Sequence, residues 1–326
     1  MNQSKSEIRQ NYLTGNWSIF APQRSTRPND HKNKTSAKSD CPFCTGNEDM
    51  LPYLIYEVKD KKKWSVRVVP NKYPALSKEY RNQLFNYGFY SFMKCAGYQE
   101  VIIETPHHNV NLALLTENEI LQVINTYQTR YKEIINDRRI KYLLIFRNQG
   151  IKSGATRIHP HSQIMAMGFI PTYIKELEER AKKHFMITKN NLFLEMLDFE
   201  LKDKKRILLT NKSFTAFAPY ASECPYEIWI MPKKQNANFT KITIKQKKDL
   251  AKILKKTLFK LYKLLNNPDY NMIVYTPSKD NINSKFLQWY IQIRPRFSLS
   301  AGFEQATHMH INSIFPEDAI KELKII

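Results

Sequence analysis

An internal repeat is the feature of this sequence that most constrains its fold. The segment HPHSQI in the first half corresponds to QWYIQI in the second half, with Gln163 aligned on Gln292. A proline ends a strand pattern upstream in each copy: Pro106 lies 57 positions before Gln163, and Pro232 lies 60 positions before Gln292. Because similar spacing of equivalent motifs indicates a duplicated unit, the sequence predicts two similar halves.

Each copy has the order strand, helix, strand, strand. Capping boxes at residues 116–119 (TENE) and 243–246 (TIKQ) each begin a helix with apolar residues on one face. The apolar segments YLLIF and NMIVY follow as buried strands. In the second copy, Gln288 and Tyr290 replace the two histidines of HPHSQI. We therefore expect the first copy to retain the chemistry and the second mainly the scaffold, with GFIPTYIKELEERAKKHF forming a linking helix.

The composition excludes several classes of protein. The chain has 326 residues, 42% of them hydrophobic, which favours a globular protein with a large core. It has no apolar run of the roughly 18 to 20 residues that a membrane span needs, and its N-terminus lacks the apolar core of a secretory signal. We therefore expect a cytoplasmic protein without a membrane partner. The net charge of +21 leaves nucleic acid as an unfavoured partner, because the lysines are scattered, and favours small anionic substrates such as phosphates.

The four cysteines are too few for a disulfide scaffold in a chain of this length. Cys41 and Cys44 form CPFC, which has the spacing of half a zinc site. The remaining ligands would come from a set of four histidines: His107, His108, His159 and His161. Alternate residues of a strand share a face, so either member of HPH could bind the metal. Two thiols in an ordinary turn are the alternative.

A histidine that does not bind metal could act as a nucleophile towards phosphorus. Such chemistry needs donors around the phosphate, and the loop upstream of HPHSQ offers two glycines and two hydroxyls, at Gly150, Ser153, Gly154 and Thr156. A glycine-containing loop alone is a weak signal, but one that leads into HPHSQ is stronger. An ordinary strand that contains two histidines is the alternative.

At this point the chain resembles a known family. NQGIKSGATRIHPHSQ is similar to the active-site segment of galactose-1-phosphate uridylyltransferases, the transferase branch of the histidine-triad superfamily, and of the related ADP-glucose phosphorylase-like proteins. GNWSIFAPQRSTRP, CPFC, PNKYPAL, ETPHH, PYASECPYEIWIMPKK and AGFEQATHMHINSIFPEDA resemble further family segments in the same order. The resemblance covers nearly all of residues 14–320.

The resemblance implies an α+β fold of two tandem histidine-triad-like halves, each a mainly antiparallel sheet with packed helices. Residues 1–172 would form the catalytic domain with a zinc site, and residues 173–326 a degenerate copy. The implied zinc ligands are Cys41, Cys44, His108 and His159.

The resemblance also implies that His161 attacks the α-phosphorus of a nucleoside-diphosphate sugar. Sugar 1-phosphate leaves, and a second phosphate-bearing substrate then takes the nucleotide from the histidine. Gln163 stands where hydrolases of the superfamily carry a third histidine, and an amide cannot donate a proton as imidazolium does, which favours transfer over hydrolysis. The implied substrate-binding residues are Arg24, Arg27, Asn71, Asn148, Ser153, Gly154, Thr156 and Glu304.

Two departures from the family pattern affect these expectations. QWYIQIRPRF has no histidine, so we expect a second structural metal, found in some uridylyltransferases, to be missing. QATHMH replaces a run resembling LGTG after Glu304, and its His308 and His310 put the sugar specificity in doubt.

Three functions remain open at this stage. The first is uridylyl transfer between UDP-glucose and galactose 1-phosphate, by a zinc enzyme that forms homodimers as family members commonly do. The second is phosphorolysis of ADP-glucose or of a dinucleoside polyphosphate through the same histidine. The third is a zinc-stabilised nucleotide- or nucleic-acid-binding protein without turnover.

Overall fold

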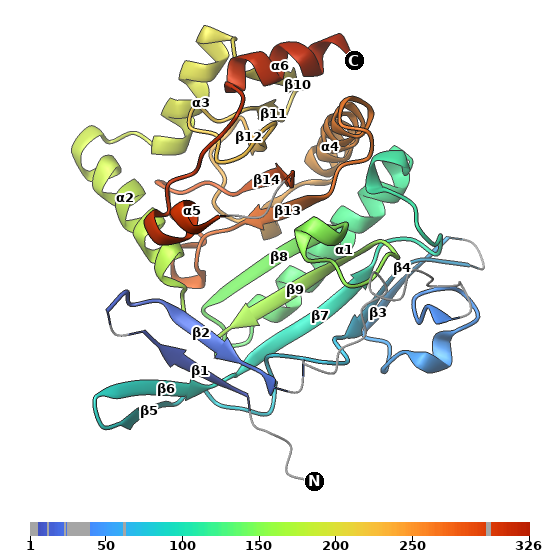
Figure 1. The fold of residues 1–326 in the computed structure, drawn as a ribbon, viewed down its shortest axis with the longest axis vertical. Helices are drawn as coiled ribbons and strands as arrows, with labels where there is room; N and C mark the ends of the chain where they lie inside the picture. Colours follow the sequence, from blue (N-terminus) through green and yellow to red (C-terminus); the bar gives the residue numbers. More distant parts are fainter. Residues whose placement is uncertain (1–5, 12, 23, 25–39, 61–62, 298–300) are drawn as a thin grey trace.

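A ten-stranded antiparallel sheet organises the chain (Figure 1). The computed structural model describes residues 6–11, 13–22, 24, 40–60, 63–297 and 301–326. The strand order is β10-β11-β12-β14-β13-β8-β9-β7-β4-β3. The strands are β3 (Tyr56–Asp60), β4 (Lys63–Pro70), β7 (Gly97–Ile103), β8 (Tyr142–Gln149), β9 (His161–Met167), β10 (Ile207–Thr210), β11 (Phe214–Phe217), β12 (Ile228–Pro232), β13 (Tyr270–Tyr275) and β14 (Tyr290–Pro295).

The sheet order confirms the internal repeat. From the central pair outward, β8, β9, β7, β4 and β3 on one side mirror β13, β14, β12, β11 and β10 on the other. The register agrees residue by residue: Phe146 pairs with Ile273 across the centre, Phe146 pairs with Gln163, and Ile273 pairs with Gln292. The alignment of the two glutamines made from the sequence is therefore correct in space. Both halves share one continuous sheet.

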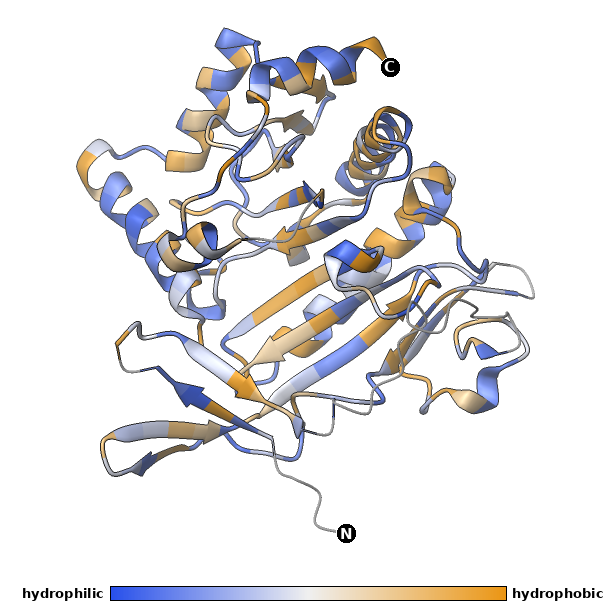
Figure 2. Cartoon of the chain, in the orientation of Figure 1, coloured by the Kyte–Doolittle hydropathy of each residue, from blue (hydrophilic) through white to orange (hydrophobic). Residues whose placement is uncertain are grey.

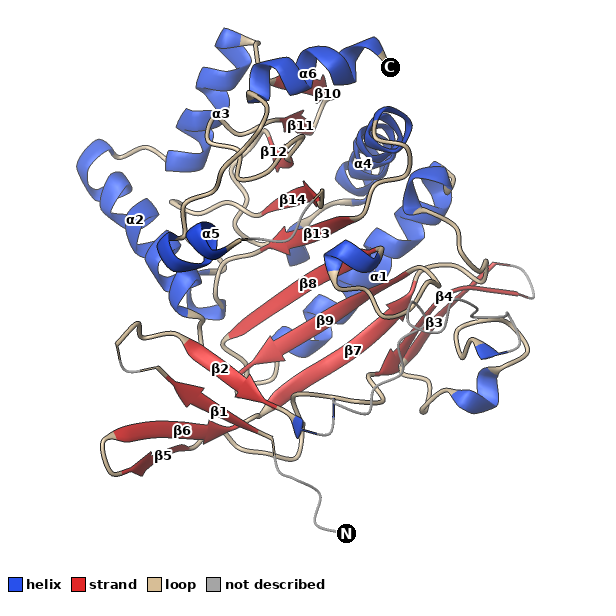
Figure 3. Ribbon diagram, in the orientation of Figure 1, coloured by secondary structure: helices blue, strands red, loops and turns tan. Residues whose placement is uncertain are grey.

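Helices α1 (Glu117–Ile135) and α4 (Ile244–Leu264) cover one face of the sheet and pack against each other (Figure 3). Each begins with the predicted capping box, at Thr116 and Thr243. Their apolar faces enter the main core together with alternate residues of the strands, such as Ile145 and Ile164. Figure 2 shows the resulting apolar character of β8. Because strand residues alternate between faces, residues such as His161 and Gln163 lie on the opposite, open face.

The remaining elements flank this framework. The predicted linking helix is present as α2 (Thr172–Thr188), and among the helices that the structure describes none is long and apolar enough to span a membrane. A second sheet, with the order β2-β1-β6-β5, was not predicted. The elements outside the large sheet are β1 (Glu7–Gln10), β2 (Trp17–Phe20), β5 (Leu84–Tyr87), β6 (Tyr90–Lys94), α3 (Leu192–Asp203), α5 (Gly302–Thr307) and α6 (Pro316–Ile325).

Candidate active site

The structure brings together two cysteines and two histidines as a possible metal site. One ligand atom from each of Cys41, Cys44, His108 and His159 lies within 4.8 Å of all the others. Cys44 Sγ lies 3.2 Å from His108 Nδ1 and 3.6 Å from His159 Nδ1, and Cys41 Sγ lies 3.6 Å from His159 Nδ1. A tetrahedral zinc with bonds of about 2.3 Å to sulfur and about 2.1 Å to nitrogen separates the two ligand atoms by about 3.6 Å. The four residues therefore fit zinc.

The protonation states in this cluster also suit a metal ion. The carbonyl oxygen of Thr105 can only accept, so His159 Nε2 donates to it at 2.8 Å and the ring lone pair lies on Nδ1, on the side of the thiols. Burial lowers the pKa of His159 to about 4, which keeps the imidazole neutral. Burial raises the pKa of Cys41 to about 12, so a thiolate there requires a cation.

His161 is placed differently from His159. The prediction that one strand holds both histidines is wrong for His159, because β9 begins at His161 and His159 lies in the bend before it. His161 Nδ1 donates to the carbonyl oxygen of His159 at 2.9 Å. A carbonyl cannot donate, so in the neutral ring the proton lies on Nδ1 and the lone pair on Nε2. His161 is thus held by the backbone of a metal-site residue.

A cavity of about 340 Å³ opens beside His161 on the open face of the sheet. One wall is apolar, and the ring of Phe43 in this wall lies 5.5 Å from the ring of His161. An apolar wall beside an imidazole suits a ligand that has a flat apolar part and a charged part. The residues that line the cavity are Asp40, Pro42, Phe43, Met50, Leu51, Pro52, Val69, Pro70, Asn71, Lys72, Tyr73, Val101, Thr156, Arg157, His161 and Gln163.

The predicted residues Asn71 and Gln163 meet in this cavity. Asn71 Nδ2 donates to Gln163 Oε1 at 3.5 Å, and Asn71 Oδ1 accepts from the backbone N–H of Tyr73 at 2.9 Å. Gln99, which the sequence did not single out, donates to the same oxygen of Gln163 at 3.4 Å. Strand register places Gln99 at the position of Glu227 in the second half, and no signal in the sequence could have found this equivalence.

The predicted phosphate loop has the required backbone geometry. Gly154 is left-handed, with φ of 82°, and Ser153 Oγ donates to the carbonyl oxygen of Gly150 at 2.7 Å. A Cβ on Gly150 would come within 1.7 Å of Asp269 Oδ1, so only glycine fits there. Thr156 lines the cavity beside His161, whereas the other predicted loop residues do not.

A second cavity of about 270 Å³ lies at the loop and contains Asn148. Arg157, which was not predicted, lines both this cavity and the cavity beside His161. It therefore brings a positive charge to the boundary of both spaces. No motif in the sequence distinguishes this arginine from the many other cations of the chain.

The remaining predicted residues are not gathered around His161. Arg24 Nη1 donates to the carbonyl oxygen of Tyr73 at 2.6 Å and so lies beside the cavity, while Arg27 falls outside the described residues. Glu304 lines a separate cavity of about 530 Å³. His310 lines that cavity too, with Nε2 3.5 Å from Glu223 Oε2.

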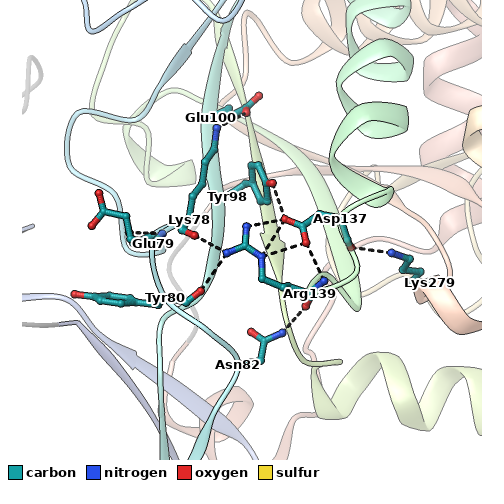
Figure 4. A network of polar contacts seen from close by, with 10 residues as sticks. Lys78, Glu79, Tyr80, Asn82, Tyr98, Glu100, Asp137, Arg139 and Lys279 are labelled. Atoms are coloured by element: carbon teal, nitrogen blue, oxygen red, sulfur yellow. Dashed lines mark hydrogen bonds and ion pairs between the residues drawn. The ribbon is translucent and has the colours of Figure 1, made fainter.

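A polar network holds the segment between β4 and β5, which begins with the cavity residues Asn71 to Tyr73 (Figure 4). Arg139 Nη1 donates to the carbonyl oxygens of Lys78 at 2.5 Å and Tyr80 at 3.3 Å. Asp137 accepts from Arg139 Nη2 and from the hydroxyl of Tyr98, both at 2.7 Å. The turn after α1 therefore anchors the loop that supplies one wall of the cavity beside His161.

In the second half, aromatic rings occupy the place that corresponds to His161. Tyr290, the counterpart of His161, is 2% exposed. Its ring stacks on Trp229 at 4.5 Å and on Tyr275 at 5.0 Å between centroids. The counterpart of His159, Gln288, donates to the carbonyl oxygens of Pro232 and Lys234. The copy of the site has become core, as the sequence suggested.

Comparisons with known proteins agree with this geometry. Residues 1–171 match the family model for the N-terminal domain of galactose-1-phosphate uridyl transferase, and residues 174–312 match the model for its C-terminal domain. An ADP-glucose phosphorylase of Arabidopsis thaliana is 33% identical over 99% of this chain and 93% of its own length. A galactose-1-phosphate uridylyltransferase of Thermotoga maritima is 26% identical over 98% of both chains.

Solved structures give the same result. The crystal structure of an ADP-glucose phosphorylase from Arabidopsis thaliana with bound ADP-glucose superposes with a TM-score of 0.79 at 31% identity, covering 98% of this chain and 99% of that one. A uridylyltransferase structure at 23% identity has the same fold, with a TM-score of 0.82 over 98% of this chain and 97% of that one. Matches along nearly the whole chain show that it is a nucleotidyltransferase of the galactose-1-phosphate uridyl transferase family.

Proposed function

We propose that this enzyme transfers a nucleotide from a nucleoside-diphosphate hexose to a phosphate-bearing acceptor through a covalent bond to His161. The observation that carries the proposal is the hydrogen bond from His161 Nδ1 to the carbonyl oxygen of His159, beside a cavity of nucleotide size. This contact leaves the lone pair on Nε2, the atom that would attack.

The reaction proceeds in two balanced steps. Nε2 of His161 bonds to the α-phosphorus, and the bond from that phosphorus to the bridging oxygen breaks, which releases hexose 1-phosphate. A phosphate oxygen of the acceptor then bonds to the same phosphorus, and the bond to Nε2 breaks. Both leaving groups are stable at neutral pH, so no strong general acid is needed. Gln163, Thr156 and Arg157 would neutralise charge that develops on the phosphate oxygens.

Zinc would have a structural role in this mechanism. Cys41, Cys44, His108 and His159 would hold it, and all four of its positions would be filled by the protein. The ion would fix the bend at His159, and through the carbonyl oxygen of that residue it would fix the ring of His161. No substrate atom needs to reach the metal.

Two reactions fit this chemistry. The first is uridylyl transfer from UDP-glucose to galactose 1-phosphate, the reaction implied by the family motifs. The second is phosphorolysis of ADP-glucose, which the 33% identity to an ADP-glucose phosphorylase along 99% of the chain favours. A dinucleoside polyphosphate is a further donor for the same histidine. The attack by His161 is common to all of these donors, which differ in the base, the leaving group or the acceptor.

We also propose a homodimer in a reducing compartment such as the cytoplasm. Glu304, the implied hexose-binding residue, lines a different cavity from His161, so a second copy would have to bring it to the nucleotide. All four cysteines are free thiols, which suits a reducing compartment. Residues 1–172 would form the catalytic domain and residues 173–326 the degenerate one.

Intact-mass measurement tests the proposal. The protein is incubated separately with UDP-glucose and with ADP-glucose, without acceptor, and a UMP or an AMP adduct identifies the donor. His161→Asn should form neither adduct, and an adduct on that variant would remove His161 from the mechanism. If the wild-type protein forms no adduct but binds RNA or DNA in a salt-sensitive manner, it is a binding protein and not an enzyme.

A further inference from the structure

Gln99 fixes which end of the Gln163 amide faces the nucleotide cavity. Gln99 is 6% exposed, and its Oε1 accepts from the backbone N–H of Ala75 at 2.7 Å. A backbone N–H cannot accept, so the NH₂ group of Gln99 must point to Gln163, where it donates to Oε1 at 3.4 Å. Asn71 donates to the same oxygen at 3.5 Å, so the NH₂ group of Gln163, which lines the cavity together with His161, lies on the side away from both donors.

Asn271 acts in the same manner on the other side of the nucleophile. Its Oδ1 accepts from Arg296 Nε at 2.5 Å, and because a guanidinium cannot accept, the NH₂ group of Asn271 must point away. That NH₂ group donates to Asn148 Oδ1 at 2.8 Å and to the carbonyl oxygen of Ser153 at 3.0 Å. The NH₂ group of Asn148 is therefore directed away from this contact.

Asn148 lies directly beside the nucleophile. Arg147 on β8 pairs with Ser162 on β9 in an antiparallel register, so the next positions, Asn148 and His161, are neighbours on the open face. Asn148 in turn pairs with Asn271 on β13. Asn271, Asn148 and His161 thus form a row across β13, β8 and β9. This row connects the second half of the chain to the reaction centre.

In the degenerate copy, the amide of the corresponding glutamine has the opposite orientation. Gln292 corresponds to Gln163, and Glu227 occupies the position of Gln99. Gln292 Nε2 donates to Glu227 Oε1 at 2.6 Å, because a carboxylate only accepts. The amide oxygen of Gln292 consequently points away, and among the residues that the structure describes it has no hydrogen-bond partner. A single change, from Gln to Glu, reverses the amide.

We propose that Gln99 and Asn271 are positioning residues that present N–H groups of Gln163 and Asn148 to the phosphate oxygens of the substrate. This inference rests on the proposed function. Phosphate oxygens only accept hydrogen bonds, so an amide turned the other way would present an oxygen to an anion and repel it. Donors held in place before the reaction are the most effective in stabilising charge that develops in the transition state.

The test places in the first half the carboxylate that the second half carries at the equivalent position. Gln99→Glu should weaken binding of AMP and UMP at least tenfold in calorimetry while leaving adenosine and uridine unchanged. It should also slow formation of the His161 adduct by on the order of 100-fold, as expected for loss of one transition-state donor. Asn271→Asp should act in the same direction. Glu227→Gln, the matched change in the degenerate half, should leave all of these quantities unchanged.

A double-mutant cycle separates amide polarity from direct repulsion by the new carboxylate. In a Gln163→Leu background, Gln99→Glu should have no further effect on AMP or UMP binding, and a persisting tenfold loss would overturn the proposal. If Gln99→Glu does not fold, Gln99→Met replaces it and should give an intermediate loss, because Asn71 alone then donates to the amide oxygen of Gln163. An unchanged adduct rate in Gln99→Met and Asn271→Asp would also overturn the proposal. A wild-type protein without any adduct would instead contradict the proposed function.

Discussion

Glu104 and Arg147 form a buried ion pair beneath β9, the strand that begins at His161. Arg147 Nη1 lies 2.9 Å from Glu104 Oε2, and both side chains are at most 1% exposed. The same Nη1 donates to the carbonyl oxygen of His161 at 3.4 Å, and Ser162 Oγ donates to Glu104. The pair therefore joins β7, β8 and β9 on the face opposite to the cavity.

Breaking this pair should destabilise the fold strongly. Arg147→Met leaves the carboxylate of Glu104 buried without its counter-charge, and loss of one partner from such a pair costs about 3 to 5 kcal/mol. Denaturant unfolding measures the effect. The double variant Glu104→Gln/Arg147→Met should lose less stability than the sum of the two single variants, because neither charge is then left alone. Strict additivity would show that the two residues do not interact.

Zinc should be bound at one ion per chain, and its removal should destabilise the protein. At free zinc 1,000-fold above its Kd, binding contributes about 4 kcal/mol, which corresponds to roughly 6 °C for a chain of this size. Metal analysis together with thermal unfolding before and after chelation measures both quantities.

Cys41→Ser should lose the ion, whereas Cys224→Ser, a change at a cysteine outside the cluster, should retain it. Equal zinc content in the two variants would rule out the proposed ligand set.

The network around Arg139 should affect nucleotide binding more than chemistry. Arg139→Ala removes the contacts that hold Lys78 and Tyr80, so the loop that begins with the cavity residue Asn71 becomes less ordered. We expect KM for the nucleotide sugar to rise several-fold while kcat changes little. Asp280→Asn, which removes an exposed ion pair with Lys141, is the control and should change neither quantity. A fall in kcat with unchanged KM would assign Arg139 a different role.

The same network has a defined pH dependence. Hydrogen bonds from Arg139, and further ones from Tyr98, hold the pKa of Asp137 well below its usual range. A depressed pKa in the folded state means that the stabilisation is present above the unfolded pKa of about 4 and is lost as pH falls through the folded value. Asp137→Asn should therefore lower the unfolding midpoint at pH 7 and have a smaller effect in strong acid. An equal loss at both pH values would contradict this coupling.

The main architecture of the fold could be predicted from the sequence because its signals are local. The capping boxes at Thr116 and Thr243 and the equivalent spacing to Gln163 and Gln292 each depend on short stretches of chain, and the structure confirms them. The small sheet could not be predicted, because β1 pairs with both β2 and β6 and the latter pairing joins strands more than 80 residues apart. No pattern within one strand records a distant partner.

The candidate site also contains residues that the sequence predicted and residues that it missed. The side chains of the metal cluster were predicted, because thiols and imidazoles are rare and their motif resembles a family. Gln99 and Asn271 were missed, since each is an ordinary polar residue whose neighbours depend on strand register, and Arg157 was missed because no motif distinguishes it from the other cations of the chain. Register across β7, β9, β8 and β13 comes only from the folded sheet. Residues that orient other residues are thus harder to predict than residues that react.

His161 and Tyr290 hold equivalent positions in the two halves and should respond in opposite ways to substitution. Tyr290 is 2% exposed between the rings of Trp229 and Tyr275, so Tyr290→Ala should cost about 3 to 5 kcal/mol of unfolding free energy. The rate of adduct formation per folded molecule should remain close to that of the wild type. His161→Asn should instead abolish the adduct with little change in stability. Loss of adduct formation in a fully folded Tyr290→Ala protein would show that the position of Tyr290 takes part in the chemistry and is not only part of the core.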